Sequence, residues 1–179
     1  GKKAGITDIR ALGSGNAGAT NVLRTQGKAM AILVLFGDIA KGVIGAWIGY
    51  LLAGALGGAL GSAGAIVGHC FPIFFQFKGG KGVATGIATI MMVDPYVGLA
   101  AVLVFILTII LTKTVSLGSI LGAASIYITV WIFKPELPLI LYCLFGATLV
   151  IVRHRSNIHR IINGTEDRLD HFSERRSSS

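Results

Sequence analysis

A glycine-rich segment with two lysines is the part of the sequence best suited to chemistry. Residues 77–85 read Phe-Lys-Gly-Gly-Lys-Gly-Val-Ala-Thr, and at the centre lie Lys78, Gly79, Gly80, Lys81 and Gly82. Glycines allow a backbone to approach a ligand closely and to turn successive N–H groups toward an anion, whose charge the lysines neutralise. We therefore predict a phosphate-binding loop. The alternative is a flexible loop whose lysines only set the membrane orientation.

The segment differs from the Walker motif of ATPases. That motif places Ser or Thr directly after its Gly-Lys pair, whereas Gly82 follows Lys81 here. The sequence therefore does not indicate ATP hydrolysis. Between the two lysines we favour Lys81 as the phosphate ligand, because glycines flank it on both sides, while Lys78 follows the aromatic Phe77. His69, in the preceding Gly-His-Cys-Phe-Pro, is a further candidate.

A second polar segment, residues 13–24, is rich in small residues and precedes an apolar stretch. Its hydroxyl and amide side chains belong to Ser14, Asn16, Thr20 and Asn21. Such groups can bind hydroxyls and phosphate oxygens, and the guanidinium of Arg24 can bind a phosphate through two parallel hydrogen bonds. The pattern also fits the start of a helix with Thr20 or Asn21 as its N-cap. The residues alone leave both interpretations open.

A third polar segment, residues 153–160, reads Arg-His-Arg-Ser-Asn-Ile-His-Arg and follows the last apolar stretch. Arginines at the end of a membrane helix often bind lipid headgroups, which is one interpretation. In a helix, residues three or four apart share a face. His154 and Asn157 form one such pair, and Arg155 and His159 form another. The sequence does not show which pair faces a ligand.

The composition indicates an integral membrane protein. Of 179 residues, 53% are hydrophobic and only 13% charged, and the mean hydropathy is +0.75, so polar residues are too few to cover a soluble globule. The formal net charge is +8. The basic residues lie beside apolar stretches and not on a separate polar domain, which favours anionic headgroups or an anionic substrate over nucleic acid. Cys70 and Cys143 show neither metal nor disulfide spacing.

Six apolar stretches are candidates for membrane-crossing helices, at residues 29–50, 51–68, 83–94, 95–112, 114–133 and 137–152. A crossing needs about 20 residues. We place a boundary between Asp94 and Pro95, because the residue before a proline disfavours helical backbone. The third stretch then forms a half-span that begins at the glycine-rich segment. We therefore predict an all-α polytopic membrane protein with about six spans and glycine-rich cytoplasmic loops.

The basic residues predict the orientation of the chain in the membrane. With six crossings, fourteen of the 16 Lys and Arg residues fall on one side. Only Lys134 falls in a loop on the other side, so the positive-inside rule places the three polar segments in the cytoplasm. Lys41 lies within a span, three residues after Asp38. For these two residues we favour a structural ion pair over a catalytic one.

Taken together, the three polar segments resemble the motifs of a known family. Gly-Ser-Gly-Asn-Ala-Gly-Ala-Thr-Asn, then Gly-His-Cys-Phe-Pro with Phe-Lys-Gly-Gly-Lys-Gly-Val-Ala-Thr, then Arg-His-Arg-Ser-Asn-Ile-His-Arg are similar to the motifs of the bacterial acyl-phosphate:glycerol-3-phosphate acyltransferases of the PlsY type. The resemblance covers nearly the whole chain, in the family's order. It implies a seven-span inner-membrane protein with a cytoplasm-facing active site, of which we expect the first span to be missing from this sequence.

The resemblance also implies an activity. A fatty acyl group would pass from acyl phosphate to the sn-1 hydroxyl of glycerol 3-phosphate, giving lysophosphatidic acid and phosphate in the first step of phospholipid biosynthesis. The implied partners are membrane lipids and the soluble enzyme that supplies acyl phosphate, with no nucleic acid, cofactor, metal or coenzyme A. We expect one membrane-embedded domain over residues 1–164 and a poorly ordered cytoplasmic tail over residues 165–179.

The matching positions assign roles to particular residues. The resemblance implies that catalysis involves Ser14, Arg24, Lys81, His154 and Asn157. It implies substrate or phosphate binding by Asn16, Thr20, Asn21, His69, Lys78, Gly79, Gly80, Gly82, Arg153 and Arg155. The three segments contain no Asp or Glu. The segments therefore do not supply the carboxylate that usually orients a histidine base. We expect direct acyl transfer, without a protein carboxylate as base and without an acyl-enzyme intermediate on Ser14.

A small transporter or channel for phosphorylated metabolites is the alternative function. Transporters place polar groups near the middle of the bilayer, whereas this sequence concentrates them at one predicted face. Only Asp38 and Lys41 fit a transporter better. We therefore favour the enzyme.

Overall fold

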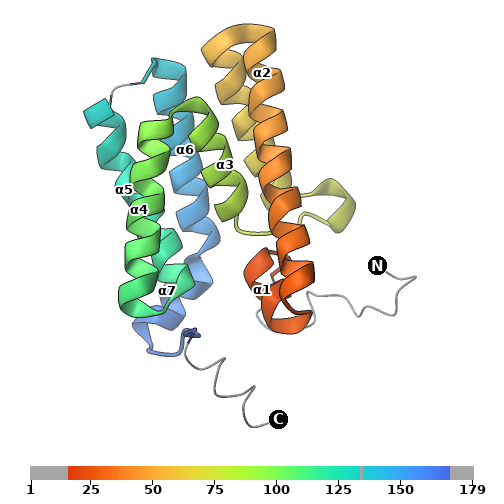
Figure 1. Ribbon diagram of the computed structural model, residues 1–179, viewed down its shortest axis with the longest axis vertical. Helices are drawn as coiled ribbons and strands as arrows, with labels where there is room; N and C mark the ends of the chain where they lie inside the picture. The colour runs from red at the N-terminus through yellow and green to blue at the C-terminus, as the bar shows by residue number, and fades with distance from the viewer. Residues whose placement is uncertain (1–15, 134, 170–179) are drawn as a thin grey trace.

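The computed structural model describes residues 16–133 and 135–169, and the regular secondary structure of these residues is helical throughout. The helices are α1 (Ala19–Thr25), α2 (Lys28–Cys70), α3 (Val83–Val93), α4 (Pro95–Thr112), α5 (Val115–Phe133), α6 (Leu137–Arg153) and α7 (Arg155–Ile162), with a 3₁₀ turn, η3 (Ile73–Phe75), after α2. They form an elongated bundle (Figure 1). The predicted all-α fold is confirmed. Ser14 and Lys134 lie outside the described residues.

α2 is a hairpin of two antiparallel arms (Figure 1). Its backbone leaves the helical region at Ala53 (φ −151°, ψ 31°) and Gly54 (φ 57°, ψ −142°), and glycine tolerates such a positive φ. The arms approach so closely that a Cβ added at Gly49 would overlap the carbonyl group of Gly57. Small residues permit this packing between membrane helices. The two arms correspond to the first two apolar stretches predicted from the sequence.

The boundary between α3 and α4 lies at Asp94, as predicted. Asp94 has extended backbone (φ −150°, ψ 99°), ends α3 and is the N-cap of α4. Its Oδ1 accepts a hydrogen bond from Val97 N at 2.9 Å. Pro95 follows in the first turn of α4, where its missing N–H group has no consequence. α3 is therefore only 11 residues long, which is about half of what a membrane crossing needs.

Buried hydroxyl groups hold α3 against α2 and α6. Thr85 and Thr89 are both completely inaccessible to solvent. Thr85 Oγ1 donates to the main-chain oxygen of Asp38, in the first arm of α2, at 3.0 Å. The hydroxyl of Thr89 contacts that of Tyr142 in α6. These contacts fix the N-terminal half of α3, and with it the end of the glycine-rich segment, relative to the two longer elements.

By length and hydropathy, three helices of the described residues can cross a membrane: α2 with the 3₁₀ turn, counted as one, α4 and α5. α6 and α7 meet at an angle of 55° and form a fourth if they are counted together. Large apolar side chains of these helices are exposed, among them Leu52 (80%), Leu111 (80%) and Ile128 (66%). Such surfaces suit lipid and not water. The protein is a helical membrane protein, and the number of six spans stays a prediction.

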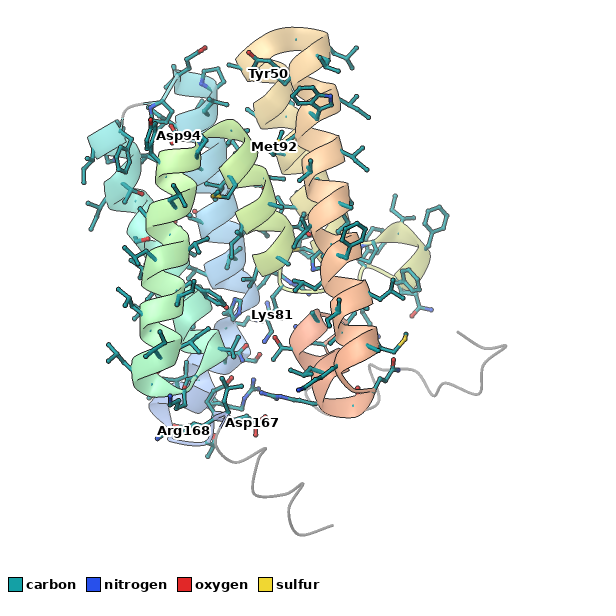
Figure 2. All side chains as sticks on the ribbon, viewed as in Figure 1. Tyr50, Lys81, Met92, Asp94, Asp167 and Arg168 are labelled. Carbon is teal, nitrogen blue, oxygen red and sulfur yellow. The ribbon has the colours of Figure 1, made fainter. Side chains whose placement is uncertain are left out.

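Labelled side chains mark the two ends of the bundle (Figure 2). Tyr50 and Asp94 lie at the end where α2 turns back, and Asp167 and Arg168 lie at the opposite end. Lys81 lies between these two levels, in the space between the helices (Figure 2). The glycine-rich segment is therefore away from the end at which the hairpin turns.

Candidate active site

The three polar segments line one cavity of about 310 Å³, a size that suits a small-molecule ligand. Its walls come from α1, the first turn of α3, the start of α5 and the junction of α6 with α7. The predicted site residues in its lining are Asn16, Thr20, Asn21, Arg24, His69, Lys81, Gly82, His154 and Asn157. The predicted site residues outside this lining are Lys78, Gly79, Gly80, Arg153 and Arg155. Ser14 lies outside the described residues.

The N-terminus of α3 opens into this cavity. Gly82 is the N-cap, with a φ of +83° that favours glycine, and it lines the cavity together with Val83 and Ala84. The first four N–H groups of a helix have no partner within the helix, and the helix dipole adds partial positive charge at this end. The arrangement favours an anion in the cavity.

Lys81 reaches the cavity from the loop before α3. Its Nζ donates to Asn157 Oδ1 at 2.6 Å. Burial lowers the pKa of Lys81 to about 8; the negative charge of Glu166 opposes this effect, and the positive charge of Arg160 adds to it. The ammonium group is therefore still mainly protonated at neutral pH. Lys78, in contrast, is exposed and borders a different cavity.

The junction of α6 with α7 turns one of the two predicted pairs toward the cavity. His154 and Asn157 are only 2% and 3% exposed and line the cavity, whereas Arg155 and His159 are exposed. His154 Nδ1 lies 2.8 Å from the carbonyl oxygen of Val150. Because a carbonyl oxygen only accepts, Nδ1 carries the hydrogen of the neutral ring, and Nε2 is left as the acceptor.

Glu166 is a cavity residue that the three motifs do not contain. Its carboxylate accepts hydrogen bonds from Ser116 Oγ (2.7 Å), Asn157 Nδ2 (2.6 Å) and Arg160 Nε (2.7 Å). Burial alone would raise the pKa of Glu166, but these hydrogen bonds and the charge of Arg160 outweigh burial, and the pKa is lowered. The ionised carboxylate holds the amide of Asn157 so that its oxygen faces Lys81.

The segment after Gly164 contributes to the cavity, and the expected division into a domain and a poorly ordered tail stays a prediction. Asp167 lines the cavity, and its Oδ2 accepts a hydrogen bond from Arg24 Nη1 in α1 at 2.6 Å. Residues 165–169 thus pack against the membrane-embedded helices. Residues 170–179 lie outside the described part of the chain.

The expected ion pair within α2 is present, and it includes a histidine. Lys41 Nζ lies 2.5 Å from Asp38 Oδ1 and 2.6 Å from His69 Nδ1. Asp38 Oδ1 and His69 Nδ1 lie 3.2 Å apart. The three motifs themselves supply no carboxylate partner for a histidine, but the α2 hairpin brings Asp38, from outside the motifs, to His69. Both residues also line a second cavity of about 330 Å³, which Lys78 borders.

The glycines do not form the predicted cradle of N–H groups. Gly79 N donates to Cys70 O and Gly80 N donates to His69 O, each at 3.2 Å, so both amides are used within the protein. A Cβ added at Gly80 would collide with the His69 ring. Glycine suits this position because the loop packs against the end of α2, and the N–H groups at the cavity that remain available to an anion are those that begin α3.

The first polar segment also differs in detail from its alternative interpretation. α1 begins at Ala19 with Gly18 as its N-cap, so neither Thr20 nor Asn21 caps it. Asn16 Oδ1 accepts a hydrogen bond from Gly18 N at 3.0 Å. Asn21 is 3% exposed. The start of α1 and the residues just before it thus carry Asn16, Thr20 and Asn21 to the cavity.

The fold and the cavity define a class of protein: a helical membrane protein with lysine, arginine, histidine and asparagine side chains around a cavity whose basic groups suit a small anion. Within residues 16–133 and 135–169, no three His, Cys, Asp or Glu side chains are grouped as a metal site requires. The sequence missed Asp38, Ser116 and Glu166 as cavity or neighbouring residues, because each lies outside the three motifs.

Comparison with known proteins shows the family to which the chain belongs. A family model described as glycerol-3-phosphate acyltransferase matches residues 1–164. The glycerol-3-phosphate acyltransferase of Thermoanaerobacter sp. (strain X514) is 44% identical over 167 residues, which cover 93% of this chain and 84% of the relative. The chain belongs to the glycerol-3-phosphate acyltransferase family.

Two solved structures agree with this membership. A crystal structure of PlsY (YgiH), an integral membrane glycerol 3-phosphate acyltransferase in its glycerol 3-phosphate form, superposes with a TM-score of 0.88 at 37% sequence identity. The superposition covers 94% of this chain and 84% of the PlsY chain. The crystal structure of PlsY in its lysophosphatidic acid form gives a TM-score of 0.82 at 37% sequence identity. This superposition covers 87% of this chain and 80% of the PlsY chain.

Proposed function

We propose that the protein transfers a fatty acyl group from acyl phosphate to the sn-1 hydroxyl of glycerol 3-phosphate, giving lysophosphatidic acid and inorganic phosphate. The observation that carries this proposal is that Arg24, Lys81, His154 and Asn157, from three distant segments, line one cavity in a member of this family. The acceptor and the acylated product of such a reaction are the two molecules that name the related crystal forms.

Several polar groups of the cavity have a role in the proposed reaction. Arg24 and Lys81 neutralise phosphate, aided by the N-terminus of α3. Asn157 and the Nε2 atom of His154 hold the acceptor hydroxyl. Ser14 keeps its predicted catalytic role, in which it positions the acceptor alcohol, and it lies outside the described residues. These groups bring the hydroxyl and the acyl carbon together and stabilise the charge that develops between them.

The chemistry we propose is direct transfer. The sn-1 oxygen forms a bond to the acyl carbon, and the bond from this carbon to the phosphate oxygen breaks. The hydroxyl proton passes to an oxygen of the leaving phosphate. The nearby carboxylates are otherwise engaged, since Glu166 accepts from three donors and Asp38 accepts from Lys41. Phosphate is a good leaving group, so a separate general base is not required.

The competing chemistry uses Ser14 as a nucleophile and passes through an acylated serine. Incubation of the purified protein with acyl phosphate alone, followed by mass spectrometry, separates the two accounts. Direct transfer predicts no stoichiometric acyl adduct. An adduct on Ser14 that disappears when glycerol 3-phosphate is added would overturn direct transfer and leave the overall reaction unchanged.

A comparison of acyl donors tests the proposed function itself. Purified protein in lipid bilayers receives labelled glycerol 3-phosphate with one of three donors: acyl phosphate, acyl-coenzyme A or an acyl carrier protein thioester. We expect labelled lysophosphatidic acid only with acyl phosphate. Equal use of acyl-coenzyme A would contradict the proposed donor, and no product with any of the three would contradict the proposed reaction.

We further propose that the protein lies in the inner membrane of a bacterium with its site toward the cytoplasm. The asymmetric distribution of Lys and Arg supports this orientation. The acyl donor would come from a soluble enzyme that makes acyl phosphate, and the product would leave into the surrounding lipid.

A further inference from the structure

A side chain outside the cavity holds the loop that carries Lys81. Arg153 Nη2 donates to Gly79 O at 3.1 Å and to Gly80 O at 3.1 Å, and its Nε donates to Gly80 O at 3.2 Å. Its guanidinium carbon lies 5.1 Å from the centre of the Phe71 ring. Each of these contacts is to a neutral group of the protein, and none leads into the cavity.

We propose that Arg153 is a positioning residue, which fixes the Gly79–Gly80 backbone and so places the Lys81 ammonium group in the cavity. This inference rests on the proposed function, and it replaces the earlier expectation that Arg153 binds phosphate. Arg153 acts through Lys81 and does not touch substrate.

The loop is held along both of its edges. On one edge, the carbonyl oxygens of Gly79 and Gly80 accept from Arg153. On the other edge, the N–H groups of the same two residues donate to Cys70 O and His69 O, at the end of α2. The N–H and C=O groups of two successive residues are thus engaged between α6 and α2. The position of the next residue, Lys81, follows from this double attachment.

The same helix junction also receives the end of the Lys81 side chain. Asn157, four residues after Arg153, accepts from Lys81 Nζ at 2.6 Å. Lys81 is therefore fixed at its backbone through Arg153 and at its charged group through Asn157. A lysine side chain has several rotatable bonds, so both attachments are needed to hold the charge in one place.

Arginine suits this task better than lysine does. Its planar fork donates in fixed directions, here to two carbonyl oxygens at once, and its flat face lies over an aromatic ring. Lysine in its place would keep the charge near the loop but lose the fixed geometry. If Arg153 instead bound phosphate directly, lysine in its place would keep most of that function, because lysine also binds phosphate as a point charge.

A double-mutant cycle separates positioning from direct binding. The variants are Arg153→Lys, Lys81→Ala and the combination, with Arg168→Lys as the matched control because Arg168 is exposed and does not line the cavity. We expect Arg153→Lys to lower kcat/KM for glycerol 3-phosphate about tenfold in the parent protein and by less than about twofold when Lys81 is already Ala. Fully additive losses would overturn the proposal.

A chemical measurement tests the same point without substrate. Amine-reactive labelling with site-resolved mass spectrometry reports how accessible Lys81 is. We expect Lys81 to be labelled several times faster in Arg153→Lys, with exposed Lys28 unchanged as the internal reference. Unchanged labelling of Lys81 would overturn the proposal. This measurement needs no catalytic activity, so it applies even if Lys81→Ala is too inactive for the kinetic cycle.

A second variant covers the case in which Arg153→Lys does not fold. Phe71→Leu removes the ring below the guanidinium and leaves the hydrogen-bond donors in place. We expect the same direction of change in Lys81 labelling, with a smaller size, and no change would count against the proposal. Failure of the parent protein to make lysophosphatidic acid would overturn the proposed function, whereas the labelling result judges Arg153 by itself.

Discussion

In the proposed reaction, the Lys81 ammonium group is positioned in advance for the phosphate of a substrate. Its Nζ donates to Asn157 Oδ1, and Glu166 holds the other end of the same amide. The ammonium group is therefore in position before a substrate arrives, and less binding free energy is lost in ordering it. Burial keeps water away and strengthens its attraction for an anion, at the cost of a lower pKa.

This lowered pKa predicts how substrate binding depends on pH. The pKa of Lys81 is about 8, so the cation prevails below this pH and is lost above it. The phosphate of the substrate is already a dianion above about pH 7. We expect KM for glycerol 3-phosphate to rise up to about tenfold for each pH unit above 8. Steady-state kinetics from about pH 7 to about pH 10 measure this rise.

Lys81→Arg is the control for the pH experiment, because arginine stays charged over this range. It should move the rise in KM out of the measured window. A KM of the parent protein that stays constant up to about pH 10 would contradict the assignment of Lys81 as a phosphate ligand.

The two lysines of the loop should contribute unequally. Lys81→Ala removes a charge-assisted contact and should cost about 1.5 to 3 kcal/mol in kcat/KM, or roughly ten- to a hundredfold. Lys78 is exposed, borders the second cavity and is absent from the lining of the first, so Lys78→Ala should cost less than about twofold. Kinetics of both variants, with thermal unfolding as a check of the fold, test this. Equal losses would contradict the choice of Lys81.

At the level of elements, the site depends on three connections that hold short pieces in place. The α2 hairpin brings Asp38 to His69, and Thr85 attaches α3 to the first arm. The α6–α7 junction supplies His154 and Asn157. A short helix such as α3 has little stability of its own. Its packing against α2 and α6 therefore keeps its N-terminus directed at the cavity.

The hairpin packing predicts opposite effects for two glycines of the same helix. A Cβ at Gly49 would overlap the backbone of Gly57, whereas a Cβ at Gly37 would meet no atom within 4 Å. We expect Gly49→Ala to lower stability by about 1 to 3 kcal/mol through overpacking. Gly37→Ala should be neutral or stabilising by less than about 1 kcal/mol, because alanine favours helix. Thermal unfolding in detergent measures both.

The interpretation would be wrong if the two variants unfolded at the same temperature. Gly37 is the matched control, since it lies in the same arm and also has helical neighbours. The comparison therefore isolates the close approach of the arms from the general effect of replacing glycine.

The element boundaries were predictable from local signals. Asp94-Pro95 marks the break between α3 and α4 because proline restricts its predecessor and aspartate caps a helix, and both effects involve only neighbouring residues. The grouping of three motifs around one cavity followed from the resemblance. His154 and Asn157 could be paired by helical spacing, but not chosen over Arg155 and His159.

The parts that the sequence did not reveal are contacts between distant residues. The amides of Gly79 and Gly80 bond to the end of α2, and no local pattern shows that they are used. Asp38 meets His69 only because α2 folds back on itself. Glu166 stands after the last motif, in a segment whose charged composition is typical of a tail.

For the whole molecule, the orientation in the membrane is a prediction that labelling can test. Cys70 and Cys143 are buried, so new cysteines at Glu136 and Asn163 would dominate the signal. We expect a membrane-impermeant thiol reagent to label position 136 in intact cells and position 163 only after the cells are opened, because Lys and Arg residues concentrate on the cytoplasmic side. Labelling of both positions in intact cells would contradict the orientation.

The central claim is that the whole molecule couples acyl transfer to phosphate release. The most direct test is the stoichiometry of the reaction in proteoliposomes that contain the purified protein, acyl phosphate and labelled glycerol 3-phosphate. We expect one lysophosphatidic acid and one inorganic phosphate for each acyl phosphate consumed, and no phosphate release beyond the protein-free rate without glycerol 3-phosphate. Protein-dependent phosphate release without lysophosphatidic acid would contradict it.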